Sequence, residues 1–264
     1  PTPARPRHVP TQSGPAGDTV VYLSSCGCRT LGPAAGEPDP RPVSEVMRSV
    51  LAKAGFHVID LNQYDELCCG LPFRSKGFPE QADAKRTQVM ERLKSASRNG
   101  DFTVICDTSP CSQELKAAQD SGLDIQDSVQ FLYERVLPRL RVTPEETPVA
   151  LHLTCSTRRM GTADTFEKLV RALARHVVIP EDITCCGFAG DKGFTTPELN
   201  ASALETLEAQ VQSAGCVEGL SNSRGCEIGL SNHSGLPYHH VVYLMDRVSQ
   251  PKTHEESDHA HAHQ

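Results

Sequence analysis

Two pairs of adjacent cysteines carry the most specific chemical signal in this sequence. The pairs open two Cys-Cys-Gly triplets, at residues 68–70 and 185–187. A Lys-Gly-Phe triplet follows each pair, at residues 76–78 and 192–194, and a Pro-Glu dipeptide stands shortly after both. Because the same residues recur in the same order, the sequence indicates an internal duplication.

Adjacent cysteines favour one kind of metal chemistry over the others. A disulfide between neighbours would distort the peptide and the S–S torsion. A mononuclear zinc site usually takes ligands spaced by two to four residues. Two neighbouring thiolates that point apart can instead reach two metals of one cluster, which favours an iron–sulfur centre.

Composition limits the classes of partner and compartment. The 264 residues carry a net charge of −7 with scattered basic residues, so no nucleic-acid partner is expected. Eleven cysteines, an odd number in a chain of this length, favour ligation in a reducing compartment over a disulfide scaffold. No stretch has the ~20 apolar residues of a membrane span and no signal peptide is seen, so a soluble, cytoplasmic protein is expected.

Hydrophobic patterns predict an α/β fold with two similar lobes, each a mainly parallel sheet flanked by helices. Short β-branched runs end beside cysteines, and in open α/β sheets ligands bind at that carboxyl edge. The predicted strands are 19–23, 56–59, 102–105, 149–153 and 177–179, with a weak strand before residue 221. The predicted helices begin near residues 44, 79, 109, 129, 165, 195 and 241.

The two halves can be aligned on their cysteines. This alignment pairs Cys26 with Cys155, Cys68 and Cys69 with Cys185 and Cys186, and Cys111 with Cys226. Cys106 aligns with Ser221, so the first lobe is expected to have a fifth ligand that the second lacks. Cys28 and Cys216 have no cysteine counterparts and are interpreted as bystanders. The predicted metal ligands are Cys26, Cys68, Cys69, Cys106, Cys111, Cys155, Cys185, Cys186 and Cys226.

Domain boundaries follow from composition and from the repeat. Residues 1–18, rich in Pro, Gly, Ser and Thr, are predicted to be a linker from a preceding domain. The first lobe is predicted at 19–140, a Pro-bounded hinge at 141–148 and the second lobe at 149–250. Residues 251–264 form a His-rich tail that could scavenge metal, although a disordered acidic tail is the simpler interpretation.

Glycines and lysines near the cysteine pairs are candidate cofactor-binding residues. Gly70 and Gly187 could donate N–H groups to cluster sulfur, or could simply make tight turns. Lys76 and Lys192 could offset cluster charge, or could be solvated surface lysines. His152, three residues before Cys155, is interpreted as a satisfied core histidine rather than a ligand.

Five stretches together resemble a known family, the tandem cysteine-rich CCG domain. That domain occurs in the cysteine-rich subunit of heterodisulfide reductase, in glycolate oxidase iron–sulfur subunits, and in the carboxyl-terminal part of bacterial FAD-linked D-lactate dehydrogenases, which the chain resembles most closely. The resemblance spans about residues 20–248. The stretches are 68–78, 106–111, 152–156, 185–194 and 226–231.

The resemblance implies an electron-transfer module of an oxidoreductase. In this interpretation, FAD in a preceding domain or partner subunit oxidises a D-2-hydroxy acid such as D-lactate. Iron–sulfur centres of the [4Fe–4S] type, with a ferredoxin-like segment, then pass the electrons to a quinone or another respiratory acceptor. The segment itself is expected to lack the substrate site and catalytic residues, and a peripheral place at the inner face of the membrane is compatible with this role.

Two alternatives stay open. The heterodisulfide-reductase type would hold a catalytic noncubane [4Fe–4S] cluster on five cysteines, with each motif ending in Cys-x-x-Cys. Here the first lobe has Cys106 and Cys111 separated by four residues, and the second lobe ends in Cys226 alone. A structural zinc or docking module, with zinc in one lobe, is the second alternative.

Overall fold

The computed structural model describes residues 18–34, 37–61, 67–117 and 122–252. Its first half is built on a four-stranded parallel sheet of order β2-β1-β3-β4. The elements of this half are β1 (Thr19–Leu23), α1 (Cys26–Thr30), α2 (Val43–Lys53), β2 (His57–Asp60), α3 (Leu71–Ser75), α4 (Pro79–Ala96), β3 (Thr103–Cys106), α5 (Ser109–Lys116), β4 (Ile125–Asp127), α6 (Ser128–Phe131) and β5 (Leu140–Val142).

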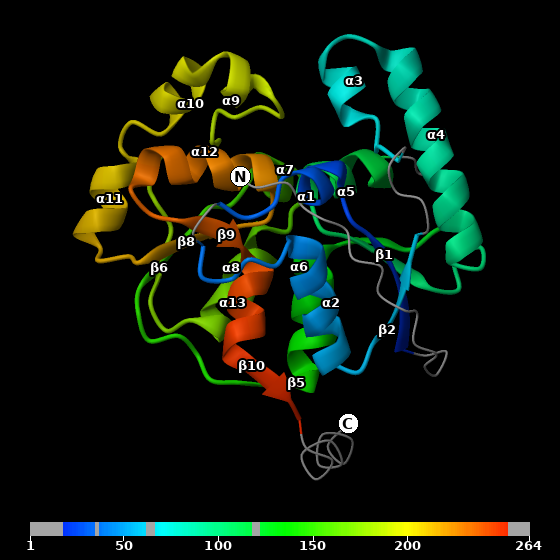
Figure 1. Ribbon diagram of the computed structural model, residues 1–264, viewed down its shortest axis with the longest axis horizontal. Coiled ribbons are helices and arrows are strands. Elements are labelled where there is room, and N and C mark those ends of the chain that lie inside the picture. Colours follow the sequence, from blue (N-terminus) through cyan, green and yellow to red (C-terminus); the bar gives the residue numbers. More distant parts are fainter. Residues whose placement is uncertain (1–17, 35–36, 62–66, 118–121, 253–264) are drawn as a thin grey trace.

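The second half repeats this plan with a parallel sheet of order β7-β6-β8-β9. Its elements are β6 (Val149–Leu151), α7 (Cys155–Arg159), α8 (Ala163–Leu173), β7 (Val177–Val178), α9 (Lys192–Thr195), α10 (Pro197–Ala203), α11 (Leu207–Ser213), β8 (Glu218–Ser221), α12 (Arg224–Ser234), β9 (Tyr238–His240), α13 (Val241–Val248) and β10 (Ser249–Pro251). The sheet of each half, with the helices around it, is called the first or second lobe below. The predicted fold class, α/β with two similar lobes, is confirmed (Figure 1).

Several elements differ from the prediction, among them α12, which carries Cys226 and was not predicted to be a helix. The edge strands β4 and β9 were not predicted, because three-residue strands with polar members leave no alternating pattern. The helix expected from residue 129 continues beyond α6 as a π-helical turn, Leu132–Val136, and a 3-10 turn, Leu137–Arg139. The helix expected from 195 divides into α10 and α11, and the periodicity hid the break because Leu204 and Leu207 face the same core.

The limits of the predicted domains remain predictions. The predicted hinge starts within β5, which pairs antiparallel with β10 near the end of the described chain. Most of the predicted linker, residues 1–17, and the tail from residue 253 onward lie outside the described residues. Within the part of the chain that is described, no helix combines the length and apolarity needed to cross a bilayer.

The two lobes share one hydrophobic core. Val20 and Tyr22 of β1 and Val149 and Leu151 of β6 belong to the same buried cluster, with apolar residues of α2, α6, α8 and α13. The opposite faces of the two sheets pack against separate clusters, one with α4 and α5 and one with α10, α11 and α12. Strands buried on both faces explain the continuous apolar runs in the sequence.

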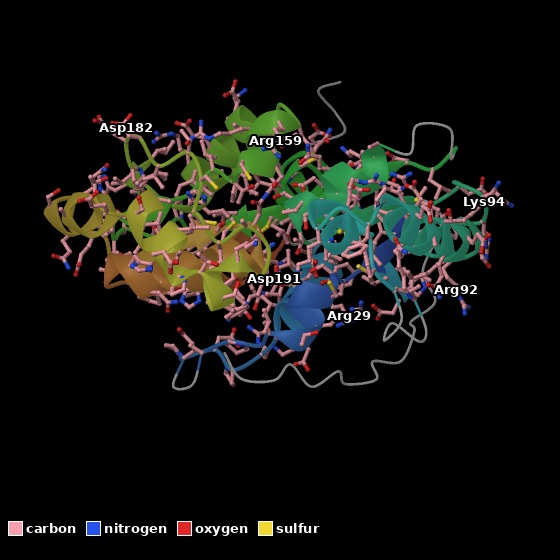
Figure 2. The ribbon with its side chains drawn as sticks, turned by 90° about the horizontal axis from the view of Figure 1, so that it is seen from above. Arg29, Arg92, Lys94, Arg159, Asp182 and Asp191 are labelled. Atoms are coloured by element: carbon pink, nitrogen blue, oxygen red, sulfur yellow. The ribbon has the colours of Figure 1, made fainter. Side chains whose placement is uncertain are left out.

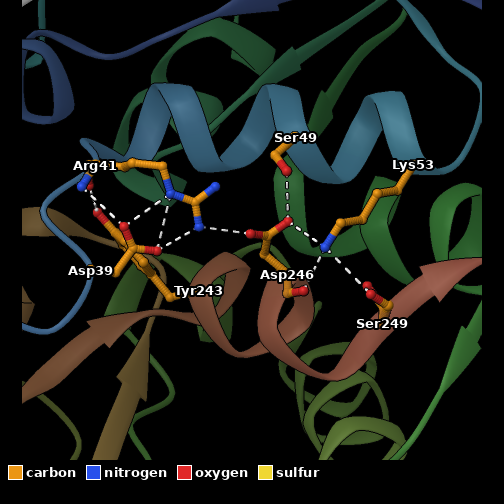
Figure 3. A network of polar contacts seen from close by, with 7 residues as sticks. All are labelled: Asp39, Arg41, Ser49, Lys53, Tyr243, Asp246 and Ser249. Carbon is orange, nitrogen blue, oxygen red and sulfur yellow. Dashed lines mark hydrogen bonds and ion pairs between the residues drawn. The ribbon is translucent and has the colours of Figure 1, made fainter.

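A polar network reinforces this junction between α2 and α13 (Figure 3). Asp246 of α13 accepts hydrogen bonds from Arg41 at 2.8 Å and from Ser49 at 2.8 Å, and it pairs with Lys53 at 2.7 Å. Burial opposes ionisation of Asp246, but hydrogen bonds from Lys53, Arg41 and Ser49 prevail and lower its pKa. The charged network therefore joins elements from opposite ends of the chain.

The substitution Asp246→Asn is expected to lower the free energy of unfolding by about 1–2 kcal/mol at neutral pH, because charge-assisted hydrogen bonds are lost. A carboxyl group whose folded pKa is lowered stabilises the fold above its unfolded pKa of about 3.9, and this contribution is lost as pH falls through the folded pKa. The difference between wild type and variant should therefore shrink below about pH 4. Denaturant unfolding at several pH values measures this difference in the free energy of unfolding.

Glu146→Gln is the matched control, because Glu146 pairs with Arg175 at 2.6 Å in a setting where the side chains are 70% and 59% exposed. Exposed pairs contribute under about 1 kcal/mol. An equal loss in both variants, or a loss from Asp246→Asn that does not depend on pH, would contradict the prediction.

Candidate metal centres

The first lobe brings its five predicted ligands to one place. Cys26 begins α1, Cys68 and Cys69 precede α3, Cys106 ends β3, and Cys111 lies in the first turn of α5. All of them line the same small pocket at the carboxyl edge of the sheet. That edge is where open α/β sheets bind ligands.

Neighbouring thiols in this pocket form a continuous series of contacts. Cys26 lies within hydrogen-bonding reach of Cys68, which contacts Cys69. The Sγ atoms of Cys69 and Cys111 are 3.3 Å apart, and Cys106 contacts Cys111. The thiols therefore lie in the order Cys26, Cys68, Cys69, Cys111 and Cys106. A series of five thiols in contact suits several metals rather than a single ion.

The second lobe repeats the arrangement with its own cysteines. Cys155 begins α7, the 185–186 pair precedes α9, and Cys226 lies in the first turn of α12. Cys155 contacts Cys185, and Cys186 contacts both Cys185 and Cys226. The four predicted ligands of this lobe thus also come together.

His152 joins the second group. One of its ring nitrogens lies with the sulfurs of Cys186 and Cys226 so that all three donor atoms are within 4.8 Å of one another. The imidazole is 2% exposed, and its Nε2 atom has no hydrogen-bond partner. The prediction of a core histidine agrees with this burial. The strand alone did not indicate that Cys226 of α12 would lie within hydrogen-bonding reach of the ring, or that Nε2 would have no partner.

Two buried side chains position the cysteine-bearing helices of the two lobes. Asp107, directly after β3, accepts from the backbone N–H of Ser25 at 2.9 Å, and Ser25 is the N-cap of α1. Asn222, directly after β8, accepts from the hydroxyl of Thr154 at 3.1 Å, and Thr154 is the N-cap of α7. Ser109 Oγ, at the start of α5, lies 2.9 Å from Thr154 Oγ1 across the lobe boundary.

Sequence reasoning missed Asp107 and Asn222, although a signal for them was present. Each follows the aligned position of Cys106 or Ser221, so the repeat itself places the two residues opposite each other. Both are fully buried, and Asp107 also accepts from the hydroxyls of Tyr22 at 2.7 Å and Ser24 at 2.9 Å. A buried polar residue at this depth is stable only when its hydrogen bonds are made.

The glycine after each cysteine pair is required by the backbone. Gly70 has φ +95° and Gly187 has φ +69°, a region that other L-residues rarely adopt. A Cβ at Gly70 would lie 2.3 Å from the carbonyl oxygen of Ala82, and one at Gly187 would lie 2.5 Å from that of Leu199. The N–H of Gly70 points to Cys68 Sγ at 3.5 Å, and that of Gly187 to Cys185 Sγ at 3.4 Å.

One of the two predicted lysines, Lys76, makes an ion pair that was not expected, whereas the role of Lys192 stays a prediction. Lys76, at the end of α3, pairs at 2.5 Å with Asp191, at the start of α9 in the other lobe. Its charge therefore links the segments that follow the two cysteine pairs rather than facing the thiols. Figure 2 shows Asp191 near the middle of the molecule, while Arg92 and Lys94 lie at its outer end. The lysine whose charge lowers the pKa of Cys68 is instead Lys85 of α4, which sequence reasoning missed.

Hydrogen bonding among the thiols stabilises a thiolate in each adjacent pair, and in the second lobe a hydrogen bond from Cys186 also lowers the pKa of Cys226, to about 6. Donation by Cys26, then by Cys69, lowers the pKa of Cys68 to about 2. Donation by Cys155, then by Cys186, lowers the pKa of Cys185 to about 2 in the same way. Each adjacent pair therefore presents a ready thiolate, the form in which cysteine binds metal.

The remaining cysteines lie outside both groups. Cys28 is the buried residue of α1. Burial and then the charge of Asp107 raise the pKa of its thiol, and its sulfur lies 3.5 Å from Thr108 Oγ1. Cys216 belongs to the apolar cluster behind the second sheet. Neither thiol takes part in the two series of contacts, and the histidines of the tail lie outside the described residues.

The donor chemistry fits an iron–sulfur cofactor. Soft thiolates gather at both sites, and glycine N–H groups point to one sulfur of each. The unpartnered His152 nitrogen adds a further donor that a metal would satisfy. In the first lobe, Cys26, Cys68, Cys69, Cys106 and Cys111 would hold the group.

The two-lobed fold and its paired cysteine sites define a class of protein. The profile of the CCG cysteine-rich domain matches residues 20–116 and again residues 149–230, so the chain belongs to that family. The two matched stretches coincide with the two halves of the repeat.

Curated relatives are similar over part of their length. The chain is 24% identical over 199 residues to an anaerobic glycerol-3-phosphate dehydrogenase subunit from Escherichia coli (strain K12), a match that covers 71% of this chain and 48% of the relative. It is 22% identical over 169 residues to lactate utilization protein A 1 of Bacillus mycoides (strain KBAB4), covering 57% of this chain and 66% of the relative. The chain thus spans about half of the first relative.

Solved structures show only a distant likeness. Picrophilus torridus aspartate racemase aligns with 89% of this chain and 96% of its own, at 11% identity and a TM-score of 0.38. An aspartate racemase homologue from Pyrococcus horikoshii OT3 covers 86% of this chain and 96% of its own, at 12% identity and a TM-score of 0.34.

Gly70→Ala is expected to cost roughly 3 kcal/mol of unfolding free energy and to reduce metal binding, because it combines a strained φ with a backbone clash. Gly77→Ala is the control: Gly77 has φ +83°, but its added Cβ would meet nothing within 4 Å. The control should cost only about 1–2 kcal/mol. Thermal unfolding and metal analysis measure both, and equal effects would show that the clash is unimportant.

In the metal-free protein, alkylation of the exposed Cys185 by iodoacetamide is expected to be nearly independent of pH between about 5 and 8, because the thiolate is already formed. An ordinary thiol would react roughly tenfold faster per pH unit over this range. Cys155→Ser removes the main thiol donor to Cys185, so pH dependence should increase. Peptide mass spectrometry follows the rate, and a tenfold rise per pH unit in the wild type would refute the assignment.

Proposed function

We propose that this chain is an iron–sulfur electron-transfer module. The observation that carries the proposal is the repeated series of soft donors at the carboxyl edge of each sheet, including a stabilised thiolate in each adjacent pair. Thiolates that contact in sequence suit a cluster, whose metals are bridged by sulfide. The family membership of both halves supports the same cofactor for both.

The cluster, when bound, would take up and release single electrons. The chain's own residues would hold and insulate it: α1, α5, α7 and α12 supply cysteines from their first turns. The N–H groups of Gly70 and Gly187 point to cysteine sulfur and would raise the cluster potential. Lys85 adds positive charge near the first site.

We further propose that the module serves a flavin-linked dehydrogenase of the D-lactate type. One relative is named as a dehydrogenase subunit and another as a lactate utilization protein, which supports a small hydroxylated substrate. FAD would be held by a preceding domain or a partner subunit, with a ferredoxin-like segment between it and this module. A quinone or another respiratory acceptor would receive the electrons, and this module would not bind the hydroxy acid itself.

A specific observation favours one alternative to a cluster, a zinc site in the second lobe. The His152, Cys186 and Cys226 donors are close enough for one ion to reach all three. A heterodisulfide-reductase type of cluster remains the rival for the first lobe, where five thiolates are available. Counts of iron, zinc and sulfide separate zinc from a cluster, and spectra that respond to added disulfide would identify the catalytic type.

The experiment is anaerobic purification followed by iron, zinc and acid-labile sulfide analysis with EPR spectroscopy. The wild type is expected to contain iron and sulfide in matching amounts. Replacing Cys68 and Cys69 by serine should remove about half of both if each lobe holds one centre, since hydroxyls replace two thiolate ligands.

Cys216→Ser is the matched control. Cys216 shares the apolar cluster of the second lobe with Cys186, but only burial shifts the pKa of its thiol and it takes no part in the series of thiol contacts, so iron and sulfide should be unchanged. Zinc without sulfide in the wild type would refute the electron-transfer function and favour a structural or docking role.

A further inference from the structure

The strand registers of the two lobes identify equivalent donor positions. In the first lobe, Leu23 at the end of β1 pairs with Cys106 at the end of β3. In the second lobe, Leu151 pairs with Leu220, and the next N–H, that of His152, donates to the carbonyl of Leu220 at 2.9 Å. His152 therefore corresponds to Leu23, and Ser221 corresponds to Cys106.

The spacing to the next cysteine agrees with this register. Cys26 follows Leu23 by three residues, as Cys155 follows His152. Cys111 follows Cys106 by five residues, as Cys226 follows Ser221. The alignment is thus supported by hydrogen bonding in the sheets as well as by the sequence.

The series of contacts is the same in both lobes except at its end. The first lobe runs through residues 26, 68, 69 and 111 to the thiol of Cys106. The second runs through residues 155, 185, 186 and 226 to the imidazole of His152. The fifth donor has therefore moved from the end of the β3-equivalent strand to the end of the neighbouring one, and has changed from sulfur to nitrogen.

A second observation concerns the ring nitrogens of His152: the ring lies within hydrogen-bonding reach of Cys226, but its Nε2 atom has no partner. The ring is 2% exposed, and the hydroxyl of fully buried Ser221 has no hydrogen-bond partner either. An unsatisfied buried polar group costs about 1–3 kcal/mol, so native structures rarely keep one. Coordination to a metal shared with Cys186 and Cys226 would satisfy the imidazole.

We propose that His152 is a ligand of the second-lobe centre and supplies one nitrogen to an iron there, alongside Cys155, Cys185, Cys186 and Cys226. This inference rests on the proposed iron–sulfur function. It makes the two centres chemically different, with five thiolates in the first and four thiolates and one imidazole in the second.

The exchange of donors sets a direction for electron transfer. A neutral imidazole in place of a thiolate leaves the centre less negative, and histidine ligation raises the potential of iron–sulfur centres. The second centre should therefore have the higher potential. With both centres bound, an electron passed from the first to the second would oxidise the first and reduce the second, and this direction would be the favourable one.

The test uses the full chain purified anaerobically, with histidine labelled by nitrogen-15. Pulsed EPR of the reduced protein should show strong coupling of the electron spin to a histidine nitrogen. His152→Leu combined with Ser221→Cys transfers the donor pattern of the first lobe to the second. This double variant should keep iron and sulfide, lose the histidine coupling, and lower the potential of one centre in a dithionite titration followed by EPR.

The reciprocal variant, Leu23→His with Cys106→Ser, is the matched control in the other lobe. It should add a second histidine coupling and raise the other potential. His233→Gln, at the far end of α12, should change neither measurement.

The outcomes separate this inference from the proposed function. Iron and sulfide in both lobes without histidine coupling, or coupling that persists in the His152 variant, would overturn the inference alone. Iron confined to the first lobe, with zinc or no metal in the second, would also overturn it. Absence of iron and sulfide from both lobes would instead refute the iron–sulfur function itself.

Discussion

The convergence of the cysteines depends on two buried hydrogen-bonded side chains, Asp107 and Asn222. Each directly follows the second central strand of its sheet and binds the N-cap residue of a cysteine-bearing helix. The donors come from short helices and loops, which would not hold their positions by packing alone. A fully satisfied buried network can fix such positions, because any displacement would leave buried polar groups without hydrogen-bond partners.

The shared core makes the two lobes a single structural unit around these sites. Strands β1 and β6 contribute to the same cluster, and α2 and α13 close it with the Asp246 network. The ion pair between Lys76 and Asp191 also joins the segments that follow the two cysteine pairs. Two sites supported by one core keep a constant separation, which matters for electron transfer because that process requires fixed distances rather than motion.

Duplication followed by divergence explains why the sites are similar but not identical. The glycine after each cysteine pair has the same backbone conformation and the same close approach to a helix in both lobes. The end of each series differs, since Ser221 stands where the first lobe has Cys106 and His152 stands where it has Leu23. The scaffold is therefore maintained by packing constraints, whereas the ligand set can change one donor at a time.

The sequence by itself determined the fold class, the duplication and the nine cysteines that line the two sites, because strand and helix periodicity and repeated motifs are local signals. Only the tertiary structure decided what depends on neighbours from other elements. Examples are the unsatisfied His152 beside Cys226 of α12, the pairing of Lys76 with Asp191, and the edge strands β4 and β9. His152 looked like a core residue because its strand is buried, and its meaning depends on a helix more than 70 residues further along the chain.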